Sequence, residues 1–219
     1  MMCDQKDNRN HNPENHEETE SFRSTLADHP LVAVLRAETA EDAIEKADAL
    51  IEAGITCIEV TFTVPNAGDV IQYLVKRKGC HVGAGTVVTA QQVQEAITAG
   101  ARFLVSPGYS FDVDMAAKDA NVPYIPGVLT PTDIMAALAQ GHRLMKLFPA
   151  NVLGPGYLRG LREPFPQVSF MPTGGISIAD MNDWFAAGAV AVGMGGALTK
   201  GTADQVKCKA QEALAQLQR

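Results

Sequence analysis

Lys146 is a charged residue in the middle of an apolar run, and it is the position that first suggests chemistry. The run RLMKLFPA at residues 143–150 has the composition of a buried strand. In a strand, Leu144, Lys146 and Phe148 share one face, because successive side chains point to opposite sides. Two interpretations are open. Either the lysine extends its head to water over an apolar stem, or an apolar pocket disfavours its charged form and leaves a neutral amine that attacks a carbonyl as a Schiff-base nucleophile.

Glu59 and Arg36 are two further charged residues in apolar runs. In the run TCIEVTFT at residues 56–63, strand alternation places Glu59, Thr61 and Thr63 on one face. A glutamate in such a place either pairs with a core cation for structural reasons or works as a general acid/base beside a lysine. Arg36 ends the run VAVLR, where its planar guanidinium offers a fork for a carboxylate or a phosphate.

A repeated pattern of strand and helix indicates how these residues are brought together. Apolar, β-branched runs begin near residues 31, 56, 81, 102, 122, 143, 168 and 189, and each is followed by a helical pattern. Hydroxyl residues mark the predicted helix starts at Thr39, Thr89, Thr130, Ser177 and Thr202. Glycines mark predicted helix ends at Gly54, Gly100, Gly141 and Gly188. Eight such units predict an α/β fold, a closed (β/α)8 TIM barrel, because a doubly wound sheet usually stops earlier.

Glycine-rich segments follow three of the predicted strands and indicate a ligand at the rim. They read GAGT at 83–86, PTGGI at 172–176 and GMGGA at 193–197. One such segment alone more often makes a tight turn than a binding site. The last two follow the seventh and eighth strands, however, and the loops after these strands form the phosphate site of many barrels through bare backbone N–H groups. We therefore expect a phosphate group to bind there.

Composition and charge exclude several other classes of function. The chain has 219 residues, 46% of them hydrophobic, so it can bury a large core. No run approaches the roughly 18 apolar residues of a membrane span, and the N-terminus lacks the order of a signal peptide, so we expect a cytoplasmic protein. The net charge of −7 argues against nucleic-acid and membrane partners. The four cysteines have no paired spacing, which predicts reduced thiols.

The first residues of the chain differ from the rest. Six acidic residues and two basic residues lie within the first 20, which accounts for −4 of the net charge of −7. Almost no apolar residue lies there to offset the entropy of ordering the segment. We therefore predict a disordered acidic tail over residues 1–21 and a single catalytic barrel domain over residues 22–219.

Together, these residues suit a carbonyl compound that bears a phosphate at its far end. The histidines lack the spacing of a metal-ligand cluster, so we expect no metal and no metal-dependent route to an enolate. Lys146 must then supply the electron sink. A protonated imine, with Glu59 moving protons, predicts cleavage or formation of a carbon–carbon bond next to a ketone.

Seven segments also carry a family resemblance: VAVLR at 32–36, IEVTFT at 58–63, GAGT at 83–86, VSPG at 105–108, PGV at 126–128, KLFPA at 146–150 and PTGGI at 172–176. In this order and spacing, over about residues 26 to 218, the chain resembles the bacterial 2-keto-3-deoxy-6-phosphogluconate aldolases, which also act as 4-hydroxy-2-oxoglutarate aldolases. The resemblance implies a class I, Schiff-base aldolase on a (β/α)8 barrel, usually a homotrimer, with no metal or organic cofactor.

The resemblance also implies roles for individual residues. Lys146 matches the Schiff-base lysine, and Glu59 matches the acid/base that exchanges protons with the substrate hydroxyl and the imine intermediates. The substrate-binding positions are Arg36 and Thr63, then Thr86, Pro107 and Phe148 around the pyruvate half, and Thr173, Gly174, Gly175, Gly195 and Gly196 at the phosphate end. The implied products are pyruvate and glyceraldehyde 3-phosphate, or pyruvate and glyoxylate from 4-hydroxy-2-oxoglutarate.

Two positions depart from the pattern and leave alternatives open. Some members of the family have an arginine at the position of Thr63 and none at that of Arg36; the arrangement in this chain also occurs in the 6-phosphogalactonate branch. Gly196 stands where many members have a serine that donates to phosphate. The galactonate epimer and 4-hydroxy-2-oxoglutarate are therefore alternative substrates. A phosphosugar isomerase or epimerase, with Lys146 as an electrostatic aid, and a non-catalytic barrel module are alternative functions.

Overall fold

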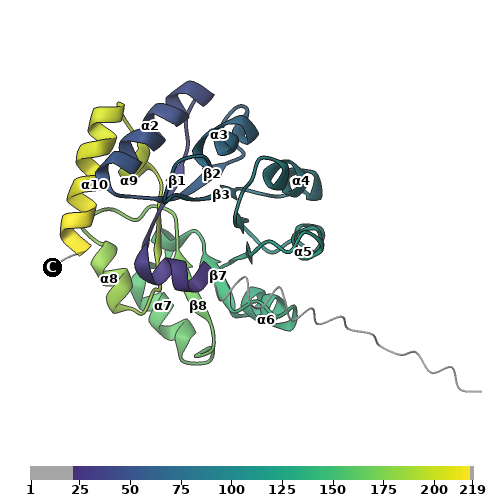
Figure 1. Ribbon diagram of the computed structural model, residues 1–219. Helices are drawn as coiled ribbons and strands as arrows, with labels where there is room; N and C mark the ends of the chain where they lie inside the picture. The colour runs from purple at the N-terminus through teal and green to yellow at the C-terminus, as the bar shows by residue number, and fades with distance from the viewer. Residues whose placement is uncertain (1–21, 218–219) are drawn as a thin grey trace, which may run out of the picture.

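The protein folds into a ring of parallel strands surrounded by helices (Figure 1). The structure is a computed structural model that describes residues 22–217. The acidic tail predicted over residues 1–21 lies outside the described residues. No helix within residues 22–217 is both long enough and apolar enough to cross a membrane.

The strands form a closed barrel. They are β1 (Leu31–Leu35), β2 (Cys57–Thr61), β3 (His81–Gly85), β4 (Leu104–Val105), β5 (Tyr124–Ile125), β6 (Gly127–Val128), β7 (Leu144–Leu147), β8 (Ser169–Pro172) and β9 (Val192–Met194). One sheet has the order β5-β4-β3-β2-β1-β9 and the other the order β6-β7-β8. β5 and β6 are two parts of one barrel strand, separated by Pro126. A parallel bridge between Thr173 and Gly193 joins β8 to β9, so the eight strands close, which confirms the predicted (β/α)8 fold.

The helices lie on the outside of the ring (Figure 1). They are α2 (Ala40–Ala53), α3 (Ala67–Leu74), α4 (Ala90–Thr98), α5 (Phe111–Asp119), α6 (Pro131–Ala139), α7 (Gly154–Arg162), α8 (Met181–Ala186), α9 (Gly196–Thr199) and α10 (Ala203–Leu217), with a short 3-10 helix η1 (Ala150–Val152).

Most of the predicted helix starts and ends are present. The Thr39, Thr89 and Thr130 hydroxyls accept from the backbone N–H three residues on, at the starts of α2, α4 and α6. Ser177 accepts from Asp180 N, but the residues between them form a turn, and α8 begins at Met181. Each predicted terminal glycine has the positive φ expected after a helix.

Strand alternation divides the apolar residues into two cores. Side chains such as Ile58 and Met145 face outward and pack under the helices. Val32 and Met171 face inward with other apolar residues, such as Phe103, and fill the barrel. A helix that includes residues 22–28 crosses the centre of the ring (Figure 1), and its buried residues Phe22 and Leu26 join the inner core. This helix therefore closes one end of the barrel, and side chains facing inward can form a site only toward the other.

A buried polar cluster ties α5 to the start of β7. The Asp114 carboxylate is fully buried and accepts from Lys118 Nζ at 3.0 Å and from the Tyr109 hydroxyl at 3.1 Å. His142 Nε2 lies 3.1 Å from its other oxygen. Burial raises the pKa of Asp114, but the hydrogen bonds and charges of His142 and Lys118 outweigh burial and hold this pKa below its usual value.

We expect Asp114→Asn to lower the free energy of unfolding at neutral pH by about 3 kcal/mol, because it leaves the half-buried Lys118 ammonium without its anion and removes an acceptor from a buried hydrogen-bonded cluster. The folded-state pKa of Asp114 is lowered, so its contribution to stability is full above the unfolded-state pKa of about 3.9 and is lost as the pH falls through the lower folded-state value. Urea unfolding of the wild type and the variant from pH 7 to pH 3 measures the difference.

The matched control is Glu52→Gln, which removes the exposed Glu52–Lys207 ion pair and is expected to change stability by less than about 1 kcal/mol. A wild-type advantage over Asp114→Asn that stays constant down to pH 3 would contradict the assigned role of the carboxylate.

Candidate active site

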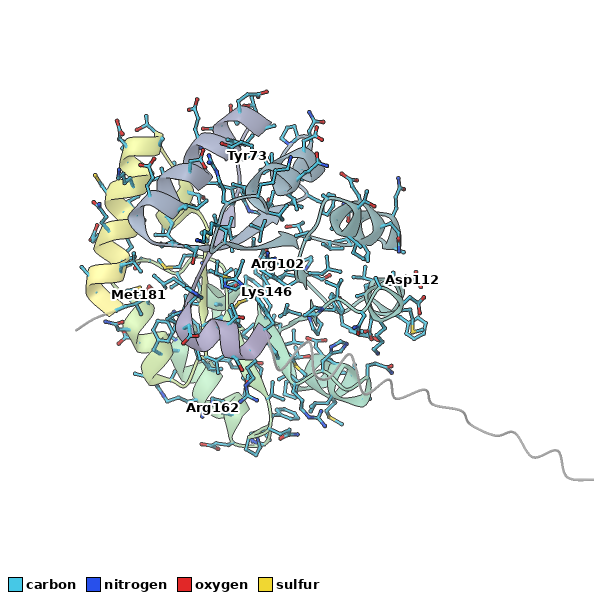
Figure 2. All side chains as sticks on the ribbon, in the orientation of Figure 1. Tyr73, Arg102, Asp112, Lys146, Arg162 and Met181 are labelled. Carbon is cyan, nitrogen blue, oxygen red and sulfur yellow. The ribbon has the colours of Figure 1, made fainter. Side chains whose placement is uncertain are left out.

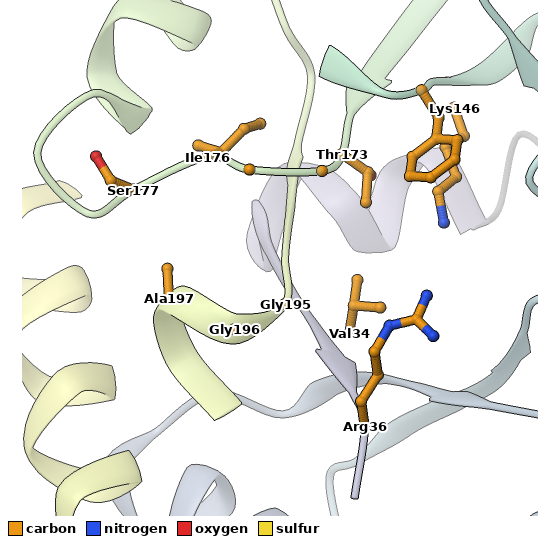
Figure 3. A pocket seen from close by; sticks show the side chains of 12 residues that line it. Val34, Arg36, Lys146, Thr173, Ile176, Ser177, Gly195, Gly196 and Ala197 are labelled. Carbon is orange, nitrogen blue, oxygen red and sulfur yellow. The ribbon is translucent and has the colours of Figure 1, made fainter. Parts of the chain in front are cut away.

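A pocket opens at the ends of β1, β7, β8 and β9, on the side where parallel barrels carry their chemistry (Figure 3). Its volume of about 380 Å³ is in the range of small-molecule sites. Eight of the residues predicted from the sequence line it: Arg36, Lys146, Phe148, Thr173, Gly174, Gly175, Gly195 and Gly196. The structure therefore brings the predicted amine, the predicted cation and the predicted phosphate loops together around one cavity.

Lys146 and Glu59 form a buried pair inside the barrel. Nζ of Lys146 lies 3.2 Å from Oε1 of Glu59, and the two residues are 4% and 0% exposed. Lys146 lies near the centre of the ring in Figure 2. Its strand β7 and the strand of Glu59, β2, are four positions apart among eight, so their inward side chains meet across the ring. The lysine therefore does not extend to bulk water over its stem. Instead its amine reaches the floor of the pocket, 5.4 Å from the centre of the Phe148 ring.

One oxygen of the Glu59 carboxylate is available for a further partner. Oε2 is buried and has no hydrogen-bond partner among the residues that the structure describes. A buried acceptor without a partner is costly, so this oxygen is suited to accept from a hydroxyl or a water that enters with a ligand. The pair can thus offer a nucleophilic amine and a proton acceptor side by side.

Arg36 reaches the pocket from the end of β1 and is held by two threonines of the β2 end. Its Nη1 donates to the Thr63 hydroxyl at 2.9 Å. The Thr63 hydroxyl lies 2.7 Å from that of Thr61, which donates to Leu35 O at 2.9 Å. Figure 3 shows the Arg36 guanidinium and the Lys146 amine extending toward the same space. Thr63 therefore supports the cation and is not among the residues that line the cavity.

The glycines of β3 make room for side chains. The sequence suggested that GAGT at 83–86 is a turn at the rim, but Gly83 and Gly85 lie within the strand. A Cβ on Gly85 would lie 2.0 Å from Oε1 of Glu59, and one on Gly83 would lie 2.4 Å from the Phe103 ring. These positions lack a side chain because the neighbouring strands fill the space, and Gly85 leaves the Glu59 carboxylate its place.

The loops after β8 and β9 form the distal wall of the pocket. Gly174 and Gly175 have φ of 102° and 69°, a region that favours glycine. Ala150 N and Asn151 N donate to Thr173 O and Gly174 O at 2.9 and 3.0 Å, which fixes the first loop. The glycines of these loops leave backbone open to the cavity, as the prediction of a phosphate site requires.

Thr86 and Pro107 lie farther round the ring and are not among the residues that line the cavity. Thr86 follows Gly85, which is the residue that packs against the Glu59 carboxylate. Pro107 follows β4, and its backbone packs directly on Gly127, where a Cβ would come within 2.2 Å of it. Both residues are on the Glu59 side of the barrel, opposite the glycine-rich loops.

Sequence reasoning did not single out four residues that line the pocket: Val34, Ile176, Ser177 and Ala197. Each lies within two residues of a predicted site residue in the sequence, and this proximity is the one signal that points to them. The Ser177 backbone N–H donates to Asp180 Oδ1, and the Ser177 hydroxyl accepts from Asp180 N, so the hydroxyl hydrogen itself is still available to donate.

The interior offers no second nucleophile or metal site next to Lys146 within residues 22–217. Burial, with the nearby charge of Glu59, raises the pKa of Cys57 to about 12, so its thiol stays protonated at neutral pH. No group of three or more His, Cys, Asp and Glu residues in the described part of the chain is arranged to hold a metal ion.

Comparisons with known proteins identify relatives of this arrangement. A family model described as KDPG and KHG aldolase matches residues 22–216. A 2-dehydro-3-deoxy-phosphogluconate aldolase of Treponema pallidum is 40% identical over 160 residues, which cover 71% of this chain and 75% of that protein. The 2-keto-3-deoxy-6-phosphogluconate aldolase of Zymomonas mobilis ZM4, solved with 3-phosphoglycerate, has a TM-score of 0.83 and 32% identity, over 89% of this chain and 95% of that one.

A third relative was solved with a reaction intermediate. The KDPG aldolase of Legionella pneumophila holds pyruvate as a covalent carbinolamine, and it has a TM-score of 0.80 and 31% identity over 88% of this chain and 96% of that one. The family model covers nearly all of the described residues, and the relatives share both the sequence and the fold. The chain therefore belongs to the KDPG and KHG aldolase family.

Proposed function

We propose that the protein cleaves 2-dehydro-3-deoxy-6-phosphogluconate to pyruvate and glyceraldehyde 3-phosphate through a Schiff base on Lys146. The observation that carries this proposal is a buried amine 3.2 Å from a buried carboxylate, at the floor of a pocket with an unpartnered carboxylate oxygen. We also propose cleavage of 4-hydroxy-2-oxoglutarate to pyruvate and glyoxylate, which needs the same two groups.

In the proposed reaction, the amine of Lys146 passes a proton to Glu59, attacks the C2 ketone and forms a carbinolamine. The carbinolamine hydroxyl takes that proton from Glu59 and leaves as water, which gives a protonated imine. Glu59 then takes the proton of the C4 hydroxyl, the C3–C4 bond breaks, and its electrons move into the imine. The aldehyde leaves, and the remaining enamine takes a proton at C3 from Glu59. Water then hydrolyses the protonated imine, which releases pyruvate, frees the amine of Lys146 and returns the proton to the Lys146–Glu59 pair.

The two ends of the substrate fit opposite sides of the site. Thr86, Pro107 and Phe148 are proposed to bind the pyruvate half near Lys146, and Arg36, held by Thr63, to bind an anionic group of the substrate. Gly174, Gly175, Gly195 and Gly196, with Thr173, are proposed to bind the phosphate, which is supported by their place on the wall of the same pocket. The substrates in the name of the family, KDPG and KHG, are consistent with this orientation.

The covalent step is tested by trapping with pyruvate and borohydride. Reduction of the imine should leave a pyruvate-derived mass on the peptide that contains Lys146, because only a neutral amine beside a proton donor forms the imine readily. Tandem mass spectrometry of the digested protein locates the adduct. The matched control is Lys46→Arg, which changes a lysine that is also buried but is paired with Asp42 on α2 and should not affect labelling.

Lys146→Arg should abolish the adduct. An unmodified Lys146 in an enzyme that still acts on phosphosugars would instead favour the isomerase or epimerase alternative, and absence of both activities would favour a non-catalytic module. Cleavage should also persist with a strong chelator, and a loss of activity there would contradict the proposed mechanism.

Gly196 is the position to change in order to test the phosphate end. A Cβ there meets no atom within 4 Å, so a serine fits. We expect Gly196→Ser to lower KM for the phosphorylated gluconate about tenfold, because a hydrogen bond to a charged group contributes about 1.5–3 kcal/mol. The KM for 4-hydroxy-2-oxoglutarate should change by less than about twofold, because it lacks the phosphate that the hydroxyl would bind.

The measurement is pyruvate release from the gluconate, galactonate and hydroxyoxoglutarate substrates, side by side. Gly160→Ser is the control, because Gly160 is exposed on α7 and also has open space around it. An equal change of KM for substrates with and without phosphate would show that Gly196 does not face the phosphate. Faster cleavage of the galactonate epimer would assign the protein to that alternative.

We further propose a homotrimer. The large apolar side chains that are exposed within residues 22–217 are Val88, Phe111, Met115, Met135, Val152 and Leu153. They come from consecutive units of the ring, after β3, β4, β6 and β7, and exposed apolar residues gathered in this way are typical of an interface between subunits. We also propose a reducing compartment such as the cytoplasm, which is supported by the free Cys57, Cys80 and Cys208.

We expect Met135→Lys to shift the protein from trimer to monomer, because Met135 is 62% exposed on α6 and a charge would be buried at the contact. Sedimentation velocity measures the assembly. Cys208→Lys, which adds the same charge on exposed α10, should leave it unchanged. A wild-type protein that sediments as a monomer at micromolar concentration would contradict the proposal.

A further inference from the structure

Thr86 has an unusual backbone conformation for its residue type. Its φ is 58°, in the left-handed region. Besides glycines, the other described residues with positive φ are Asn66 and Asn121, and asparagine tolerates this region far better than a β-branched residue does. Strained backbone of this kind persists where the surrounding structure holds it, and it is concentrated at functional sites.

The next residue, Val87, is held at both of its peptide groups by two successive residues of the β4 segment. Val87 N donates to Val105 O at 3.1 Å. Val87 O accepts from the hydroxyl of Ser106. On the other side of Thr86, Gly85 O accepts from Phe62 N at 2.8 Å. Thr86 therefore lies between two fixed points, and the bond from Ser106 is the one among these that a side chain supplies.

Ser106 has the properties of a group placed for this contact. It is 1% exposed, and Val87 is fully buried, so no water is at hand to replace the hydroxyl at the Val87 carbonyl. Its own N–H donates to Ile125 O at 3.2 Å, which anchors Ser106 to β5. The hydroxyl thus transmits the position of the β4 and β5 strands to the loop that carries Thr86.

We propose that Ser106 is a positioning residue: its buried hydroxyl holds the Val87 carbonyl and thereby fixes Thr86 in the conformation that binds the carboxylate end of the 2-keto acid. The identity of the ligand, a 2-keto acid, rests on the proposed function, whereas the hydrogen bond from Ser106 to Val87 O is a feature of the structure. Ser106 acts through Thr86 and the loop, and it does not touch the reacting atoms.

The test compares Ser106→Ala with Ser169→Ala. Ser169 is also a buried serine on a barrel strand, but it lies at the start of β8, at the closed end of the barrel and away from the pocket. We expect Ser106→Ala to raise KM about tenfold, the factor for a loss of ~1.4 kcal/mol, with kcat within about twofold, because a weaker hold on the carboxylate removes uniform binding. Ser169→Ala should leave both constants unchanged.

A second readout needs no turnover. Hydrogen exchange of the backbone amides of residues 86–88 should become at least about tenfold faster in Ser106→Ala, because local opening costs less there, and should stay at the wild-type rate in Ser169→Ala. Ser106→Cys, which keeps the size but donates only weakly, should show the same changes if the alanine variant does not fold. Ser106→Thr keeps the hydroxyl, so its KM and its exchange rates at residues 86–88 should be those of the wild type.

A double-mutant cycle tests whether the effect passes through Thr86. Thr86→Gly should itself raise KM, because it removes the threonine side chain, while its glycine accepts the φ without help. Adding Ser106→Ala to Thr86→Gly should then change KM by less than about twofold, because coupled residues give non-additive effects. Additive effects would show that Ser106 acts by another route and would overturn the proposal.

Unchanged exchange at residues 86–88 in Ser106→Ala would also overturn it, as would an unchanged KM in an active enzyme. If the wild type forms no pyruvate adduct on Lys146, the proposed function fails instead, and the exchange rates still decide whether Ser106 holds the loop.

Discussion

The contact between the amine of Lys146 and the carboxylate of Glu59 is the interaction on which the rest of the barrel depends. The two residues are 87 positions apart in the chain and are both buried. Taking such charges out of water is costly, and only close pairing offsets the cost. A closed ring satisfies this requirement, because β2 and β7 face each other across it. An open sheet of the same strands would leave the two groups far apart.

Space around this pair is set by residues without side chains. Gly85 leaves room for Glu59, Gly83 for Phe103 and Gly193 for Thr173. In each case a large or polar side chain of one strand occupies the volume that a neighbour leaves empty. The interior is therefore packed in a complementary way from strand to strand. The position of the Glu59 carboxylate depends on the missing side chain of Gly85 on β3 as well as on β2.

Much of the fold could be predicted from the sequence, because strand and helix periodicities are local properties. The predicted strand starts lie within three residues of the observed ones. Alternation placed Lys146 on the same face as Leu144, and in the structure Leu144 belongs to the inner core. What fills the space beside a residue is not local. This is why the β3 glycines were read as a turn, and why the link between Asp114 and His142 was not foreseen. The structure gathers most predicted site residues at one pocket, whereas their individual roles stay predictions.

The helix over residues 22–28 leaves the barrel open at one end only, because its buried residues Phe22 and Leu26 fill the other end. In the proposed reaction, the substrate therefore enters and the products leave through the same end. Of the two products, pyruvate leaves last, because it stays bound to Lys146 until the imine is hydrolysed.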